Sequence, residues 1–341
     1  MSTYKPLSSN DTVSTRTLLN EVIPLTGTIV SGTYSDNNIK NYAHQMFQSV
    51  YDYPYLSSSA NHIFDIAVGF STGSALSSST ANQVAKKVNI YNQMSQLMVG
   101  YDTTNAIQRF DQDGDLGSGT KIDNAFFLSF ARLLTKDEIK KGSFTLQVLT
   151  GGANTAPSGI LTISDYGAST DYRTNSPAGE FGILYTSSAA VDGTGVGLIY
   201  YQAGLAVVSA SVFNGRFGPR ADTSTYTSSV GTYLTSGSIT GSCNGFRNRL
   251  YNVQFNNTTE LNSTVYFCRA NHNEFNYSSN PTYLSGGQIV VKNNASDAPV
   301  SYITTVGLYS ADNELLAVAK LSEPLKKTVD NELTVRVRLD Y

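Results

Sequence analysis

The chain has 341 residues, with 23 basic and 26 acidic side chains and a net charge of -3 at pH 7. Charged residues make up only 14% of it, against about 25% in an average globular protein. A nucleic-acid-binding protein usually concentrates basic residues on one face, so this balance argues against a nucleic-acid partner. The 22 Tyr and 15 Phe, with abundant Thr, Asn and Gly, favour a β-rich protein, because Thr and Tyr suit strands while Asn and Gly suit turns.

The first residues, MSTYKPLSSNDTVSTR, lack the basic start and apolar stretch of a signal peptide. No apolar run approaches the roughly 18 residues that a membrane helix needs, so we expect no membrane span. The chain is therefore expected to fold in a reducing cytoplasm, where Cys243 and Cys268 would stay free thiols.

Residues 1–35 are expected to form an extended N-terminal arm, because their apolar runs are short and are interrupted by Pro24 and two glycines. Residues 36–150 follow as a mixed α+β part. Within it, apolar residues at helical spacing predict a short amphipathic helix over residues 38–50. The residues that set this spacing are Ile39, Tyr42, Ala43, Met46 and Val50.

The next segment, HIFDIAVGF, is a predicted strand over residues 62–70. After a Ser-rich loop, Thr80 is a candidate N-cap for a helix that ends at Gly100. Its apolar stripe is expected to pack on a sheet and consists of Val84, Val88, Tyr91, Met94 and Met98. The segments NAFFLSFARLL and SFTLQVLTG are predicted strands, and the capping-box pattern at residues 135–138 predicts a helical turn between them.

Residues 151–341 form the predicted β-rich part. Four strand candidates come first, namely GILTISDYG, FGILYTSSA, VGLIYYQAG and LAVVSASVF. The last two are expected to pair as a hairpin that turns at residues 202–204. Residues 217–240 are polar and predict a long loop.

Consecutive strands are predicted over residues 250–341: LYNVQFNN, LNSTVYFCRA, QIVVKN, SYITTVGLYS, LLAVAKLSE and ELTVRVRLDY. SYITTVGLYS and LLAVAKLSE should form a hairpin across a polar turn. In the last strand Val335, Val337 and Leu339 share one face and Arg336 and Arg338 the other, so we expect the apolar face to be covered. The predicted fold class is mainly β with a few short helices (α+β), with a C-terminal antiparallel β-sandwich-like part.

Asp111, Asp113 and Asp115 lie in an oxygen-rich turn that resembles a calcium loop. An EF-hand would need Gly and Glu where the chain has Leu116 and Ile122. Two interpretations therefore stay open, a calcium site and a solvated acidic turn.

Other chemical signatures are absent from the sequence. His44, His62 and His272 have no partners at zinc-ligand spacing, and there is no P-loop, GxSxG or helix-opening GxGxxG motif. We assign no catalytic, cofactor-binding or metal residues, expect no cofactor, and do not expect an enzyme.

Two further segments are candidate contacts with protein partners. Arg216, Arg220, Arg247 and Arg249 form a basic cluster in sequence, which we interpret as hydrogen-bonding groups at a subunit interface. The polar loop at 271–281 contains Phe275 and Tyr277. These aromatic residues are expected either to plug the protein's own core or to make an assembly contact.

The segments FNNTTELNSTVYFCRANHNEFNYSSNPTYL, YITTVGLYSADNELLAVAKLSEPLKK and ELTVRVRLDY resemble virion structural proteins of contractile-tailed bacteriophages, particularly those of marine and cyanobacterial hosts. The resemblance extends through LLNEVIPLTGTIVSGTY, NIKNYAHQMFQSVYDYPYLSSSANHIFDIAVGF and VGLIYYQAGLAVVSASVF. It implies a virion component of the tail, baseplate or neck, assembled in the host cytoplasm. Its expected partners are other virion proteins and copies of itself.

Two alternatives to a structural role stay open, a particle-borne glycan hydrolase and a host-glycan-binding module. A hydrolase would need converging carboxylates in a pocket, whereas a binding module would present exposed aromatic side chains on outer loops.

Overall fold

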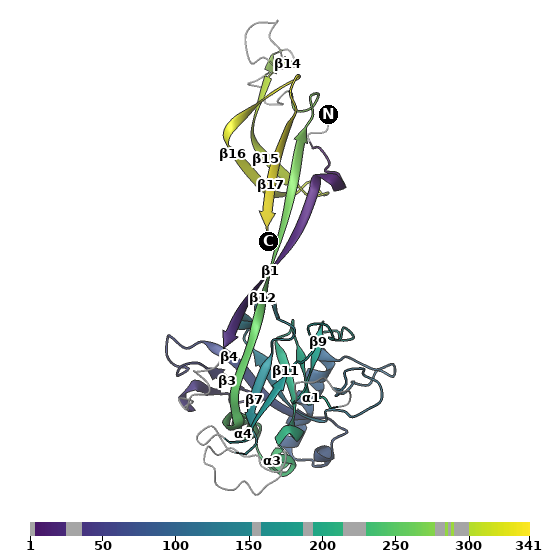
Figure 1. The fold of residues 1–341 in the computed structure, drawn as a ribbon, viewed down its shortest axis with the longest axis vertical. Helices are drawn as coiled ribbons and strands as arrows, with labels where there is room; N and C mark the ends of the chain where they lie inside the picture. The colour runs from purple at the N-terminus through teal and green to yellow at the C-terminus, as the bar shows by residue number, and fades with distance from the viewer. Residues whose placement is uncertain are drawn as a thin grey trace. The chain divides into compact units, whose positions relative to one another are not determined.

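The computed structural model describes residues 4–24, 36–151, 158–186, 194–213, 230–276, 284–285, 288–289 and 300–341. The chain forms two compact units. Unit 1 comprises Met1–Leu18 and Glu260–Tyr341, and unit 2 comprises Leu19–Thr259. The structure is mainly β with antiparallel sheets, as the sequence predicts (Figure 1).

The centre of unit 2 is a seven-stranded sheet with the order β2-β3-β4-β5-β11-β10-β9. Its strands are β2 (Ile39–Asn41), β3 (Gln48–Tyr51), β4 (His62–Phe70), β5 (Asn124–Phe130), β9 (Phe181–Leu184), β10 (Gly197–Tyr200) and β11 (Leu205–Ser209). All neighbouring strands in it are antiparallel. Residues of β9, β10 and β11 are buried on both faces, so this sheet is an interior layer.

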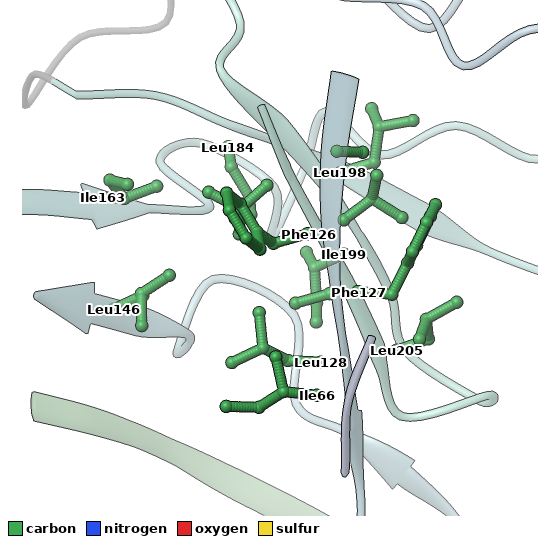
Figure 2. Packing of buried hydrophobic residues seen from close by; sticks show 14 of the residues in the cluster. Ile66, Phe126, Phe127, Leu128, Leu146, Ile163, Leu184, Leu198, Ile199 and Leu205 are labelled. Atoms are coloured by element: carbon green, nitrogen blue, oxygen red, sulfur yellow. The ribbon is translucent and has the colours of Figure 1, made fainter. Parts of the chain in front are cut away.

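Helices cover opposite faces of this sheet. Phe126 and Phe127 are consecutive in β5 and so point to opposite faces. The Phe127 ring lies 6.2 Å from that of Tyr91 in α1 (Asn82–Met98), and the Phe126 ring lies 4.9 Å from that of Phe246 in α4 (Ile239–Arg249). Figure 2 shows both phenylalanines among the aliphatic side chains of the core.

Gly69 in β4 lets α1 approach closely. A Cβ at this position would lie 2.7 Å from the carbonyl oxygen of Lys87 and 2.8 Å from the backbone nitrogen of Tyr91. These distances are too short for any real Cβ, so the packing of helix on strand depends on glycine here.

A second sheet runs along β12 (Leu250–Ala270), a strand of 21 residues. In unit 2 its first part pairs with β7 (Thr145–Leu149) and β6 (Glu138–Ile139), and β7 pairs with β8 (Ile160–Ser164). β1 (Thr12–Pro24) is an edge strand beside β12. The Phe130 ring lies 5.8 Å from Phe144 and 5.2 Å from Phe255 of β12, so apolar side chains of both sheets share one core.

In unit 1 the second part of β12 pairs with β17 (Leu333–Asp340). A long hairpin is formed by β15 (Val300–Tyr309) and β16 (Leu315–Thr328), as predicted. A short pair consists of β13 (Leu284–Ser285) and β14 (Gln288–Ile289). The remaining short elements of the chain are η1 (Ser9–Asp11), η2 (Asp36–Asn38), η3 (Ala75–Ser78), α2 (Arg132–Thr135), η4 (Ala210–Phe213) and α3 (Val230–Ser236).

Several predicted elements are confirmed, including the strand at residues 62–70, the hairpin that turns at 202–204 and the terminal strand. The predicted helix over 38–50 is wrong. β2 and β3 form a hairpin there, in which Ile39 pairs with Val50, and Gln45 adopts a left-handed φ of 55° in the connection. Ile39 and Val50 are both buried because they are cross-strand neighbours on one sheet face.

The helix α1 is present, but its N-cap is Ala81, without a side-chain cap. Its fully buried face includes Lys87 in addition to Val84 and Tyr91. The Lys87 ammonium donates to the carbonyl oxygens of Leu234 and Gly237 at the end of α3, where unpaired helix carbonyls attract a cation. Burial lowers the pKa of Lys87 to about 8.

The predicted loop over 217–240 is wrong where the structure describes it, from residue 230, because α3 and the start of α4 lie there. Both helices are rich in Gly, Ser and Thr, which are poor helix formers, so tertiary contacts hold them. Cys243 and Phe246 of α4 are fully buried, and Ser238 caps the helix by accepting a 3.0 Å hydrogen bond from Gly241. LYNVQFNN and LNSTVYFCRA are one strand, β12, rather than two.

The predicted divisions at residues 35 and 150 do not coincide with the two units. Strands from both sides of residue 150 share each sheet of unit 2: β5 pairs with β11, and β7 pairs with β8. The described part of the predicted arm, in β1, contributes residues to both units.

Candidate functional site

The described part of unit 1 has almost no hydrophobic core of its own. Among the described residues, its only buried hydrophobic side chains are Ala270 and Val337, and the rest of the buried hydrophobic core lies in unit 2. Large hydrophobic side chains are exposed on β1, β12, β15 and β16. We call them the exposed apolar set of unit 1: Tyr4, Leu7, Val13, Leu18, Leu261, Phe275, Tyr302, Tyr309, Leu315, Leu316, Val318, Leu325, Val329 and Tyr341.

The hairpin β15/β16 shows this most clearly. Val306 pairs with Ala319 and Leu308 with Ala317 on one face, and these residues are only half-buried. On the other face Leu316 is 67% exposed and Val318 is 50% exposed. Both faces of the hairpin therefore contact water, which is unusual for strands of this length with aliphatic side chains on both sides.

Strand edges in unit 1 are also unpaired among the described residues. Within the ranges that the structure describes, β17 pairs only with β12, and β15 and β16 pair only with each other. β1 is the outer strand on the other side of β12. In β1 every residue from Val13 to Val22 is exposed. A long exposed edge strand with apolar side chains is a template for pairing with another chain.

The terminal strand β17 alternates as predicted, with Arg336 and Arg338 exposed and Val337 buried. Val335 and Leu339 are only half-buried, so the predicted full burial of this face is wrong for them. Arg338 donates a 2.8 Å hydrogen bond to Asp340 on the same strand.

Polar contacts, rather than a hydrophobic core, connect the segments of unit 1. Lys5 pairs with Glu274 at 2.5 Å, and Arg269 pairs with Asp11 at 2.9 Å. The buried Lys327 ammonium donates to the carbonyl oxygen of His272 at 3.2 Å and to Asn276 at 2.7 Å. The hydrogen bond from Lys5 holds the pKa of Glu274 below its usual value.

The loop at 271–281 is described only to residue 276, so Tyr277 lies outside the described residues. Phe275 is 45% exposed and has a left-handed φ of 53°. It therefore does not plug the core, which leaves the assembly contact as the open interpretation. Its carbonyl oxygen accepts a 2.6 Å hydrogen bond from Ser301 of the hairpin.

The predicted basic cluster does not form a surface where it is described. Arg247 and Arg249 lie in α4 with exposures of 5% and 1%, and burial lowers the pKa of Arg247 to about 10. Arg216 and Arg220 lie outside the described residues. The three histidines have different partners: His44 accepts a hydrogen bond from Met46, His62 contacts Asp65 at 2.8 Å, and His272 contacts Glu332 at 3.5 Å.

The structure brings the three predicted acidic residues together in unit 2. Asp111 and Lys121 form an antiparallel bridge that closes the loop between them. At its base Phe110 and Ile122 are buried, and Ile122 donates a 2.9 Å hydrogen bond to the Phe110 carbonyl. This anchor holds Asp111 at the edge of the hydrophobic core.

One carboxylate oxygen from each of Asp111, Asp113 and Asp115 lies within 4.8 Å of the other two. Asp111 is buried, Asp113 is half-buried and Asp115 is exposed. Lys121 contacts one oxygen of Asp111, Oδ2, and donates to the Gly117 carbonyl at 2.6 Å. Burial raises the pKa of Asp111, whereas the hydrogen bond from the Gly117 amide lowers the pKa of Asp115.

A second buried carboxylate has a structural role that the sequence did not predict. Asp165 follows β8 and accepts hydrogen bonds from the amides of Gly142 at 2.7 Å and Phe144 at 3.0 Å, and from the Tyr201 hydroxyl at 3.0 Å. Burial outweighs these donors and raises the pKa of Asp165 to about 6.

Asp165 should make the stability of unit 2 depend on pH. The pKa of Asp165 is higher in the folded chain than in the unfolded one. Its contribution to the free energy of unfolding is therefore present below the unfolded pKa of 3.8 and is lost as pH rises through about 6. The wild type should therefore lose unfolding free energy, on the order of a few kcal/mol, between pH 4 and pH 6 relative to Asp165→Asn. Urea unfolding across this range measures the difference. The exposed Asp171→Asn is the control and should follow the wild type, and parallel curves for wild type and Asp165→Asn would contradict the assignment.

No helix in the described ranges is long and apolar enough to cross a membrane. Comparison with protein-family models, with curated proteins and with solved structures finds no match to the chain.

Proposed function

We propose that the chain is a structural component of a bacteriophage particle, in the tail, baseplate or neck, and that it acts by assembling with other copies of itself through unit 1. The observation that carries this proposal is the missing core of unit 1. A hundred-residue unit normally buries a hydrophobic core, yet the described part of this one buries two hydrophobic side chains and exposes apolar residues on β1, β12, β15 and β16.

A second copy of the chain is the partner that this surface fits best. Unit 1 offers unpaired strand edges and apolar side chains on the same strands, so one copy can supply what another lacks. Its charges do not oppose self-association, because nine basic residues balance ten acidic ones, a net charge of -1. Obligate interfaces between identical subunits resemble a domain core divided between chains.

The assignment to a bacteriophage particle is supported by the resemblance of the sequence to virion structural proteins. Mass spectrometry of purified particles should find the chain at a fixed number of copies per particle. A chain that is expressed during infection but is absent from purified particles would contradict the assignment to the virion, while leaving self-association to be measured separately.

A further inference from the structure

We propose that the loop closed by Asp111 and Lys121 in unit 2 binds one calcium ion, through the carboxylates of Asp111, Asp113 and Asp115. The first observation is a buried oxygen without a partner. Oδ1 of Asp111 is inaccessible to solvent and has no hydrogen-bond partner among the described residues, although Oδ2 of the same carboxylate contacts Lys121. Buried carboxylate oxygens normally have a partner, and a cation in the loop would supply it.

The space in front of this oxygen is bounded by Gly119. A Cβ on Gly119 would lie 3.3 Å from Oδ2 of Asp113 and 3.9 Å from Oδ1 of Asp111. Both oxygens therefore lie beside the position that a side chain on Gly119 would begin to fill, and the absence of that side chain keeps the space next to them open. Gly119 also has a φ of 115°, which an L side chain rarely adopts.

The spacing of the oxygens suits calcium. Ca²⁺ binds oxygen ligands at about 2.3–2.6 Å, so two oxygens that share one ion lie no more than about 5 Å apart. The three carboxylates meet this condition as they stand, because one oxygen from each lies within 4.8 Å of the other two. Carboxylates are the ligands that this hard cation prefers, and no nitrogen or sulfur ligand is present in the group.

The charge of the site also fits a divalent ion. Three carboxylates and the ammonium of Lys121 sum to -2, which one Ca²⁺ would neutralise. Lys121 is not a ligand, because an ammonium has no lone pair to donate. Its positive charge beside Asp111 opposes the ion, so Lys121 is expected to limit the affinity.

Calorimetric titration of the full chain with CaCl₂, after removal of bound metal with EGTA, tests the site. The wild type should bind one Ca²⁺ per chain. Asp113→Asn keeps the size of the side chain and its acceptor oxygen but removes a charge, so it should weaken binding at least tenfold. The exposed Asp312→Asn in the β15–β16 turn is the matched control and should bind as the wild type does.

A second variant tests the role of Lys121. Lys121→Gln removes the opposing charge and should bind Ca²⁺ more tightly than the wild type. The melting temperature of the wild type should also rise in CaCl₂ relative to NaCl of equal ionic strength. The absence of saturable binding up to about 10 mM, beyond the weakest protein calcium sites at roughly 1 mM, would overturn the proposal. Equal affinities of wild type and Asp113→Asn would overturn it as well.

Discussion

Replacing Phe126 with alanine is expected to lower the free energy of unfolding by about 3–5 kcal/mol, the usual cost of truncating a fully buried aromatic residue. Phe126 has no exposed surface and lies in β5, between β4 and β11. Its ring lies 5.9 Å from Phe213 and 4.9 Å from Phe246, so the truncation leaves a cavity between the sheet and α4.

Denaturant unfolding of unit 2 measures this change. Leu133→Ala is the control, because Leu133 is 70% exposed on α2 and surface changes usually stay within about 0.5 kcal/mol. Equal, mild effects of the two substitutions would mean that the seven-stranded sheet is not the core that stabilises unit 2.

The double substitution Leu316→Asp with Val318→Asp should abolish self-association without unfolding the chain. Both side chains are exposed on the same face of β16, so aspartates there are solvated in the free chain. In an interface between copies the same carboxylates would be desolvated without partners, which typically costs several kcal/mol. Since about 1.4 kcal/mol corresponds to a tenfold change in affinity, a cost of about 3 kcal/mol or more should raise the dissociation constant by at least a factor of about one hundred.

Light scattering after gel filtration measures the mass of the wild type and of the variant. Leu97→Asp provides the matched control, because Leu97 is equally apolar and 65% exposed but lies on α1 in unit 2. It should leave the assembly intact. If Leu97→Asp dissociates the oligomer and the β16 double variant does not, the interface lies in unit 2 instead.

Much of the β structure could be predicted from local patterns. Strands such as β4, β11 and β17 have continuous or alternating apolar residues, and turns between them contain Gly, Asn or Asp. The elements that were mispredicted depend on contacts far along the chain. Helix α4 has a poor helix-forming sequence and is held by the burial of Cys243 and Phe246, which the sequence does not reveal.

The candidate sites were predictable only in part. The acidic residues at 111, 113 and 115 follow a visible spacing, so their grouping could be expected. The roles of Gly119 and Lys121 could not be predicted from the sequence, because they depend on how the loop closes. For the terminal strand, alternation predicted a covered face, yet Val335 and Leu339 are half-exposed because the described segments of unit 1 supply too little apolar surface to cover them.

The central claim is that unit 1 completes its core by association with other copies of the chain. Sedimentation equilibrium of the full-length protein, from micromolar concentrations upward, tests this claim most directly. We predict a closed oligomer with a single stoichiometry that the β16 double variant reduces to a monomer. A wild-type chain that sediments as a folded monomer over the whole range would contradict the claim.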